Sequence, residues 1–180
     1  MNHLLSKIGS YPFEKLNLLH KDIKPSKDVI NLSIGEPKLN ADSKVLDILN
    51  KETNSFSNYP PMNAVPELSE AYRQYLKNHF GIENVADDEV CLVAGTREGT
   101  FSIIQALFNK ENIKDKPYVV MPNPFYQIYG GATTLAGGEA KFLDCPEEDN
   151  FQPDLGSLKS EDWQKCQILV LCSPNNPTGS

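Results

Sequence analysis

The stretch Glu89–Asn109 reads EVCLVAGTREGTFSIIQALFN and joins two kinds of local pattern. Residues 90–93 form a short apolar run with β-branched side chains, which predicts a buried strand. The pair Gly95-Thr96 interrupts this run. From Arg97 onward, apolar side chains recur at near-helical spacing, so the stretch predicts a strand, a two-residue loop and then a helix.

The beginning of such a helix can hold a phosphate group. Its first backbone N–H groups have no partner within the helix, and the positive end of the helix dipole lies there. A glycine lets the backbone come close to the anion. An ordinary turn in which Gly95 serves only the geometry of the chain fits this stretch equally well, because short glycine loops are common in α/β folds.

The composition indicates a soluble, cytosolic protein that binds neither nucleic acid nor a membrane. The 180 residues carry a net charge of −7 and only two arginines, which argues against a nucleic-acid partner. The four cysteines form no Cys-x-x-Cys pair, so we expect reduced thiols and no metal site. The N-terminal stretch lacks the apolar core of a signal peptide, and no run of apolar residues is long enough to span a membrane.

Apolar periodicity predicts alternating helices and strands along the rest of the chain. Helices are expected at 12–23, 42–52, from Pro66 to a stop at Gly81, 126–135 and 154–158, and strands at 29–32, 118–121, 140–143 and 167–172. This alternation indicates an α/β fold with a mostly parallel sheet and flanking helices, preceded by a helical N-terminal arm. Ligands of such sheets bind at the carboxyl ends of the strands.

Unusual residues follow three of the predicted strands. The segments are AGTRE (94–98), PNPFYQIY (122–129) and SPNNPTG (173–179). In the last segment, either of the two bonds that precede a proline can be cis, which would hold the loop rigidly and aim the amide of Asn175 or Asn176. A plain proline-rich turn is the alternative.

Taken together, these motifs resemble the N-terminal half of the fold type I pyridoxal-phosphate (PLP) enzymes, the class I/II aminotransferases. The resemblance rests on INLSIGEP (30–37), Tyr59 ahead of LSEA (68–71), and the three segments above, in the family's order and spacing. It covers nearly the whole chain. GTRE together with NPFYQIY is most similar to the succinyldiaminopimelate aminotransferases of bacterial lysine synthesis.

The resemblance implies PLP as the cofactor and assigns it a set of residues. Gly95, Thr96 and Arg97 match the family's phosphate cup. Tyr126 matches the aromatic side chain that stacks on the pyridine ring, and Asn176 matches the asparagine that hydrogen-bonds the cofactor's phenolic oxygen.

Two further matches concern the substrate and the neighbouring subunit. Tyr59 matches a tyrosine that reaches the phosphate bound by the other subunit, which implies a homodimer. Gly35 matches a backbone contact near the substrate carboxylate. The implied substrates are an amino acid and a 2-oxo acid, with succinyldiaminopimelate and glutamate favoured over those of a general aminotransferase.

Three positions depart from the family pattern. Ser69 stands where arginine is usual, the pair Gly99-Thr100 replaces an apolar pair, and Gly130 stands where glutamate is expected. We interpret the changes at Ser69 and Gly130 as surface variation.

The family carries its Schiff-base lysine, its pyridine-nitrogen aspartate and its carboxylate-binding arginine on motifs that residues 1–180 do not contain. We therefore expect the front part of a longer enzyme, inactive alone. Residues 1–41 are expected to form an N-terminal arm and a substrate-side segment, and residues 42–180 the first part of the PLP-binding domain. A PLP lyase or decarboxylase on the same fold, or a non-catalytic phosphate-binding or dimerisation fragment, are the alternatives.

Overall fold

The computed structural model describes residues 2–59, 66–109, 111 and 116–180, and the chain divides into two compact units. The first unit comprises Met1–Ser10 and Val93–Ser180, and the second comprises Tyr11–Leu92. The expected boundary between residues 41 and 42 stays a prediction.

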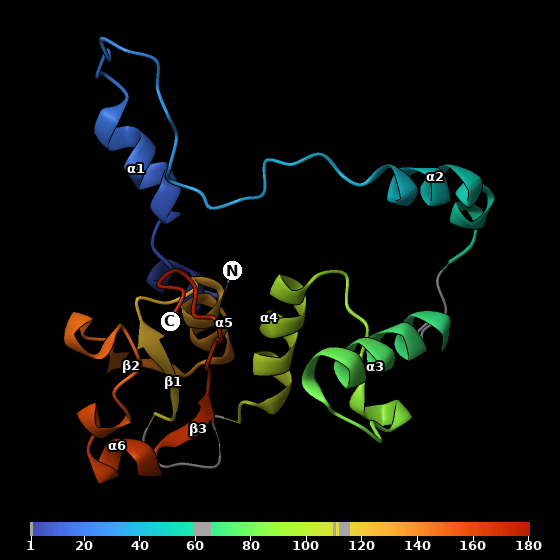
Figure 1. Cartoon of the computed structure of the whole chain (residues 1–180). Helices are drawn as coiled ribbons and strands as arrows, with labels where there is room; N and C mark the ends of the chain where they lie inside the picture. Colours follow the sequence, from blue (N-terminus) through green and yellow to red (C-terminus); the bar gives the residue numbers. More distant parts are fainter. Residues whose placement is uncertain (1, 60–65, 110, 112–115) are drawn as a thin grey trace. The chain divides into compact units, whose positions relative to one another are not determined.

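A parallel sheet is the centre of the first unit (Figure 1). Within the described residues it has three strands in the order β2-β1-β3, formed by β1 (Tyr118–Asn123), β2 (Glu139–Asp144) and β3 (Cys166–Leu169). Val119, Val120 and Met121 of β1 have no exposed surface, as expected for a central strand that is covered on both faces. The predicted parallel sheet is confirmed.

Helices flank this sheet. They are η1 (His3–Lys7), α4 (Thr96–Leu107), α5 (Ile128–Ala136) and α6 (Ser160–Gln164), with short 3-10 turns η4 (Glu147–Asp149) and η5 (Leu155–Ser157). α5 ends at Gly137, whose φ of 88° is the left-handed conformation that stops a helix. Phe108, Val119, Met121 and Tyr129 form the buried apolar core between these helices and the sheet.

The second unit is built from helices and long connections. Its elements are α1 (Pro12–His20), α2 (Ser43–Lys51), η2 (Thr53–Ser57), α3 (Pro66–Phe80) and η3 (Asp87–Glu89). The Asp42 side chain accepts a hydrogen bond from the Lys44 amide and caps α2. α3 begins at Pro66 and stops before Gly81, as the sequence predicts. None of the helices in the described part of the chain is long and apolar enough to cross a membrane.

Two predicted strands are wrong. Residues 29–32 and 90–93 have no strand partner in the described part of the chain, where the sheet contains only β1, β2 and β3. A strand exists only through hydrogen bonds to a neighbour, so an apolar, β-branched run is not sufficient to make one. Val29 and Val93 remain 73% and 49% exposed.

Other predicted elements form with shifted ends. α1 ends at His20 rather than at residue 23, and α5 begins at Ile128 rather than at residue 126. β3 ends at Leu169, although the Val170 amide still donates to the Val120 carbonyl at 2.8 Å. The expected helix at 154–158 is the single 3-10 turn η5.

Candidate functional site

The helix α4 is held so that its N-terminus faces the carboxyl edge of the sheet (Figure 1). Its C-terminal end is tied to the beginning of β3, because the Gln167 side chain bonds both backbone groups of Asn109. In the last turn of α4, the Gln105 side-chain amide donates to the Ala132 carbonyl of α5 at 2.7 Å. A helix of this length extends about 18 Å, close to the roughly 20 Å of a six-residue strand. Figure 1 shows α4 running opposite to β1, so the beginning of α4 lies toward the carboxyl ends of the strands.

The turn before α4 has a backbone conformation that favours glycine. Gly95 has φ of 116° and ψ of 142°, and a Cβ placed there would have no atom within 4 Å. No side chain caps the helix, whose first hydrogen bond runs from the Gly99 amide to the Gly95 carbonyl at 3.1 Å. The N–H groups of Thr96, Arg97 and Glu98 therefore lack acceptors within the helix. Their ligand stays a prediction.

Tyr126 lies at the same edge, in the turn between β1 and α5. Its ring is half-buried and meets the ring of Tyr129 edge to face, with centroids 5.7 Å apart and planes at 88°. It also packs against the apolar core of the first unit. Tyr129 and the core thus fix the Tyr126 ring, which keeps some exposed surface on which a flat ligand ring could stack.

Asn176 lies in the loop that follows β3 and its side chain is exposed. The Ser173-Pro174 and Asn176-Pro177 bonds are both cis, as the sequence allows. The Asn175 amide donates to the Ser180 carbonyl at 2.8 Å and the Gly179 amide to the Asn175 carbonyl at 2.7 Å, which closes the loop on itself. Since β1 and β3 are parallel neighbours, the segments that hold Tyr126 and Asn176 leave the sheet at one edge.

A second tyrosine at this edge escaped the sequence analysis. Tyr129 is only 7% exposed, and its phenol contacts the thiol of Cys172, which follows β3. Burial is the main cause that raises the pKa of Tyr129 above its ordinary value, and the contact with Cys172 is the second. The one available signal was its spacing of three residues after Tyr126, which places the two side chains one helical turn apart.

The two remaining predicted residues lie in the second unit. Gly35 belongs to an exposed connection between α1 and α2. Tyr59 follows η2, and its side chain is fully exposed. Gly95, Thr96, Arg97, Tyr126 and Asn176 all belong to the first unit, and the roles of these residues, like those of Gly35 and Tyr59, stay predictions.

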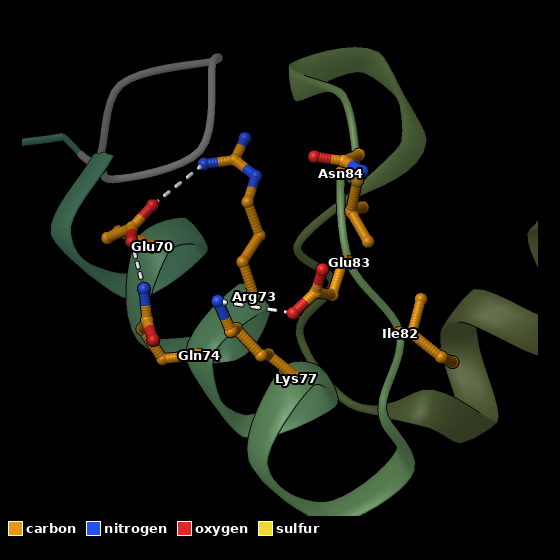
Figure 2. A pocket seen from close by; sticks show the side chains of 8 residues that line it. Glu70, Arg73, Gln74, Lys77, Ile82, Glu83 and Asn84 are labelled. Atoms are coloured by element: carbon orange, nitrogen blue, oxygen red, sulfur yellow. Dashed lines mark hydrogen bonds and ion pairs between the residues drawn. The ribbon is translucent and has the colours of Figure 1, made fainter.

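A surface pocket in the second unit lies between α3 and residues 82–85, and none of the predicted site residues lines it (Figure 2). Its charged groups pair with one another: Arg73 with Glu70 at 3.5 Å, and Lys77 with Glu83 at 3.4 Å. Gln74 donates to Glu70 at 2.8 Å, and this bond lowers the pKa of Glu70. The pocket thus offers no unbalanced charge to a substrate.

Two departures from the family pattern differ from expectation. Ser69 is only 5% exposed, so its interpretation as surface variation is wrong. Its hydroxyl has no hydrogen-bond partner among the described residues. Gly130 is half-buried, and a Cβ at this position would lie 3.2 Å from Cε2 of Phe125. The Phe125 ring leaves little room for a Cβ at position 130, which favours glycine there.

Known proteins match this chain over most of its length. Residues 27–180 match the family model described as aminotransferase class I and II. An LL-diaminopimelate aminotransferase from Natranaerobius thermophilus is 29% identical over 181 residues, which cover 99% of this chain and 46% of that protein. An aspartate aminotransferase from Pyrococcus horikoshii is 28% identical, over 92% of this chain and 41% of its own. The chain therefore spans less than half the length of these relatives.

Solved structures show the same fold. An aminotransferase from Neisseria meningitidis superposes with a TM-score of 0.90 at 39% identity, covering 100% of this chain and 46% of its own. The aminotransferase AspB from Helicobacter pylori superposes with a TM-score of 0.85 at 34% identity, covering 96% and 44%. These likenesses confirm the predicted α/β class and its sheet with flanking helices.

Proposed function

The chain belongs to the class I and II aminotransferases, a family that depends on PLP, and from this we propose that it is the N-terminal part of an enzyme that moves an amino group between an amino acid and a 2-oxo acid. The observation that carries the proposal is the convergence of three features at one edge of the sheet. These are the uncapped start of α4, the half-buried ring of Tyr126 and the exposed amide of Asn176.

The start of α4 suits the phosphate of PLP. Three backbone N–H groups, of Thr96, Arg97 and Glu98, are free to donate, and the space beside Gly95 lets a phosphate oxygen approach them. The guanidinium of Arg97 is exposed in the first turn and adds a positive charge that can bind phosphate in a bidentate way.

Tyr126 and Asn176 suit the ring of PLP. The Tyr126 ring, which contacts the ring of Tyr129, offers a flat face on which the pyridine ring of PLP would stack. The Asn176 amide can donate a hydrogen bond to the phenolic oxygen and favour its negatively charged form. When bound, PLP supplies the electron sink that stabilises negative charge on the substrate's α-carbon. The chain's own contribution is to bind and orient that group.

The second unit provides the proposed contacts with substrate and partner. We assign Gly35 to the substrate carboxylate and Tyr59 to the phosphate held by a second copy, so that the active enzyme is a homodimer. The full exposure of Tyr59 is compatible with this reach. Residues 1–41 then form the arm and substrate-side segment, and residues 42–180 the first part of the PLP-binding domain, in a cytoplasmic enzyme.

The proposed substrate is succinyldiaminopimelate, with glutamate as the second amino donor, in lysine biosynthesis. Relatives named LL-diaminopimelate aminotransferase, at about 29% identity, support an amino acid with this carbon skeleton. The relative named aspartate aminotransferase supports a broader acidic substrate as the alternative. A lyase or decarboxylase of the same fold, or a non-catalytic dimerisation fragment, remain further candidates that the test must separate.

The test is an intact mass of the natural polypeptide, purified with PLP and treated with borohydride to reduce a Schiff base. We expect a mass about twice the 20.1 kDa of this chain, since the chain covers 46% of a relative, with one phosphopyridoxyl group on a lysine outside residues 1–180. A 20.1 kDa product with no adduct would contradict the proposal that the natural polypeptide is an aminotransferase. Glutamate formed from 2-oxoglutarate with succinyldiaminopimelate, with LL-diaminopimelate or with aspartate then identifies the donor, whereas loss of ammonia or CO₂ indicates a lyase or decarboxylase.

A further inference from the structure

Thr178 lies at the centre of a chain of side-chain hydrogen bonds in the loop after β3. Its hydroxyl accepts from Nδ2 of Asn175 at 3.0 Å and lies 2.8 Å from the hydroxyl of Ser180. The Ser180 hydroxyl donates to the Phe151 carbonyl at 3.0 Å. Because the single hydroxyl proton of Ser180 is donated to the Phe151 carbonyl, the hydroxyl of Thr178 must be the donor to Ser180. The bonds therefore run in one direction, from Asn175 to Thr178, Ser180 and Phe151.

Burial makes the bond between Asn175 and Thr178 important. Asn175 is only 5% exposed, and its Oδ1 is buried without a hydrogen-bond partner among the described residues. The bond to Thr178 is thus the one that its side-chain amide makes within the described chain. Without the Thr178 hydroxyl, both ends of a buried amide would be unpaired, which strongly disfavours the present conformation of the loop.

Asn175 and Asn176 share a peptide bond, so whatever fixes the first residue also limits the direction of the second. The backbone bonds that join Asn175 to Gly179 and Ser180 close the same loop. The link to Phe151 anchors this loop to the segment that follows β2. We propose that Thr178 is a positioning residue, which holds the loop so that Asn176 presents its amide to the phenolic oxygen of PLP. This inference rests on the proposed function.

The test uses the natural full-length polypeptide with PLP bound. Thr178→Val removes the hydroxyl at nearly constant size, Thr178→Ser keeps it, and Asn176→Ala removes the amide itself. Thr134→Val is the matched control, because it deletes a half-buried threonine hydroxyl that bonds within α5 and not in this loop. The readouts are the pH at which the absorption of bound PLP changes, and hydrogen exchange of the Asn175 and Gly179 amides without PLP.

An amide that donates to the phenolic oxygen lowers the pKa of that group, so its loss moves the absorption change to higher pH. We expect this shift in Asn176→Ala and a smaller one in the same direction in Thr178→Val. Thr178→Ser should restore the wild-type titration, and Thr134→Val should not move it. Amide exchange at Asn175 and Gly179 should be about tenfold faster in Thr178→Val.

If Asn176→Ala shifts the titration and Thr178→Val does not, the positioning role is overturned and the proposed function stands. If wild type binds PLP but Asn176→Ala shifts nothing, the assignment of Asn176 fails and the positioning role with it. If wild type binds no PLP, the proposed function itself fails. Should Thr178→Val not fold, Ser180→Ala removes the bonds of this hydroxyl to Thr178 and Phe151 but leaves the bond from Asn175 to Thr178, and must give a smaller shift in the same direction.

Discussion

The side chain of Gln167 and the backbone of Asn109 exchange two hydrogen bonds. Nε2 of Gln167 donates to the Asn109 carbonyl at 2.6 Å, and its Oε1 accepts from the Asn109 amide at 2.9 Å. The pair joins segments 58 residues apart, the end of α4 and the beginning of β3. Since α4 is anchored here at one end, the pair helps to direct its other end, with Gly95 and Thr96, to the carboxyl edge of the sheet.

We expect Gln167→Ala to lower the free energy of unfolding by about 1–2 kcal/mol, because it leaves two backbone groups of Asn109 without their partner. It should also weaken PLP retention, although residue 167 is at the opposite edge of the sheet. Urea unfolding and PLP fluorescence of the natural polypeptide measure both effects. Gln164→Ala, at an exposed position at the end of α6, is the control. Equal behaviour of the two variants would contradict the anchoring role.

Gly138 lies against the ring of Phe108 in the core of the first unit. A Cβ at this position would lie 2.9 Å and 3.0 Å from Cε2 and Cε1 of the ring, and closer still to Cζ. Phe108 is 9% exposed and so has little room to move. We expect Gly138→Ala to destabilise the protein by about 1–3 kcal/mol, as overpacking does.

Gly131→Ala is the matched control for this substitution. A Cβ at Gly131 meets nothing within 4 Å, and the residue lies inside α5. Replacing a helical glycine by alanine should therefore stabilise the protein by up to about 1 kcal/mol. Thermal melts of the two variants should move in opposite directions, and a lower melting temperature for Gly131→Ala would show that the packing around α5 differs from the structure.

How far the sequence predicts this fold depends on where the hydrogen bonds of each segment go. The runs that became β1 and β2 were predicted nearly to their ends, since these strands pair with each other within the described chain. The run at 90–93 has the same apolar, β-branched composition but has no partner there. Composition reports that a segment is suited to a sheet, whereas the partner is a property of the whole fold.

The candidate site shows the same division. A glycine ahead of an apolar run with helical spacing is a local signal for the start of a helix, and α4 begins directly after Gly95. The contact of Tyr129 with Cys172 and the bond of Asn175 to Thr178 were not predicted, because each depends on how a loop folds back or on which strands are neighbours. The burial of Ser69 was missed for a related reason, as a small polar residue gives no periodic signal.

The buried phenol of Tyr129 predicts a pH dependence of stability. Burial is the main cause, and the contact with Cys172 the second, that raises the pKa of Tyr129 above the ordinary value for tyrosine. Below about pH 10 both the folded and the unfolded chain keep the proton, so the contribution of Tyr129 to stability is complete. As the pH rises through the folded-state pKa that contribution is lost, because the unfolded chain ionises first.

Tyr129→Phe removes this titration, so its free energy of unfolding should fall less steeply than that of wild type above about pH 10. Tyr11→Phe, at an exposed position, is the control and should keep the wild-type slope. Urea unfolding at a series of alkaline pH values measures the slopes. Parallel curves for wild type and Tyr129→Phe would mean that the phenol is not buried in solution.

Gly95 is the position at which stability and cofactor binding should respond together. Its φ of 116° lies in a region that residues with a Cβ rarely adopt, so Gly95→Ala must either strain the turn or change it. The cost is expected to be about 1–3 kcal/mol, and any change of the turn moves the Thr96 and Arg97 amides away from the phosphate.

Ser102→Ala, at an exposed position in the middle of α4, adds no strain and serves as the control. We expect Gly95→Ala to bind PLP at least tenfold more weakly by fluorescence titration, with competition by inorganic phosphate weakened in parallel. Weaker PLP binding with unchanged phosphate competition would show that the start of α4 holds another part of the cofactor.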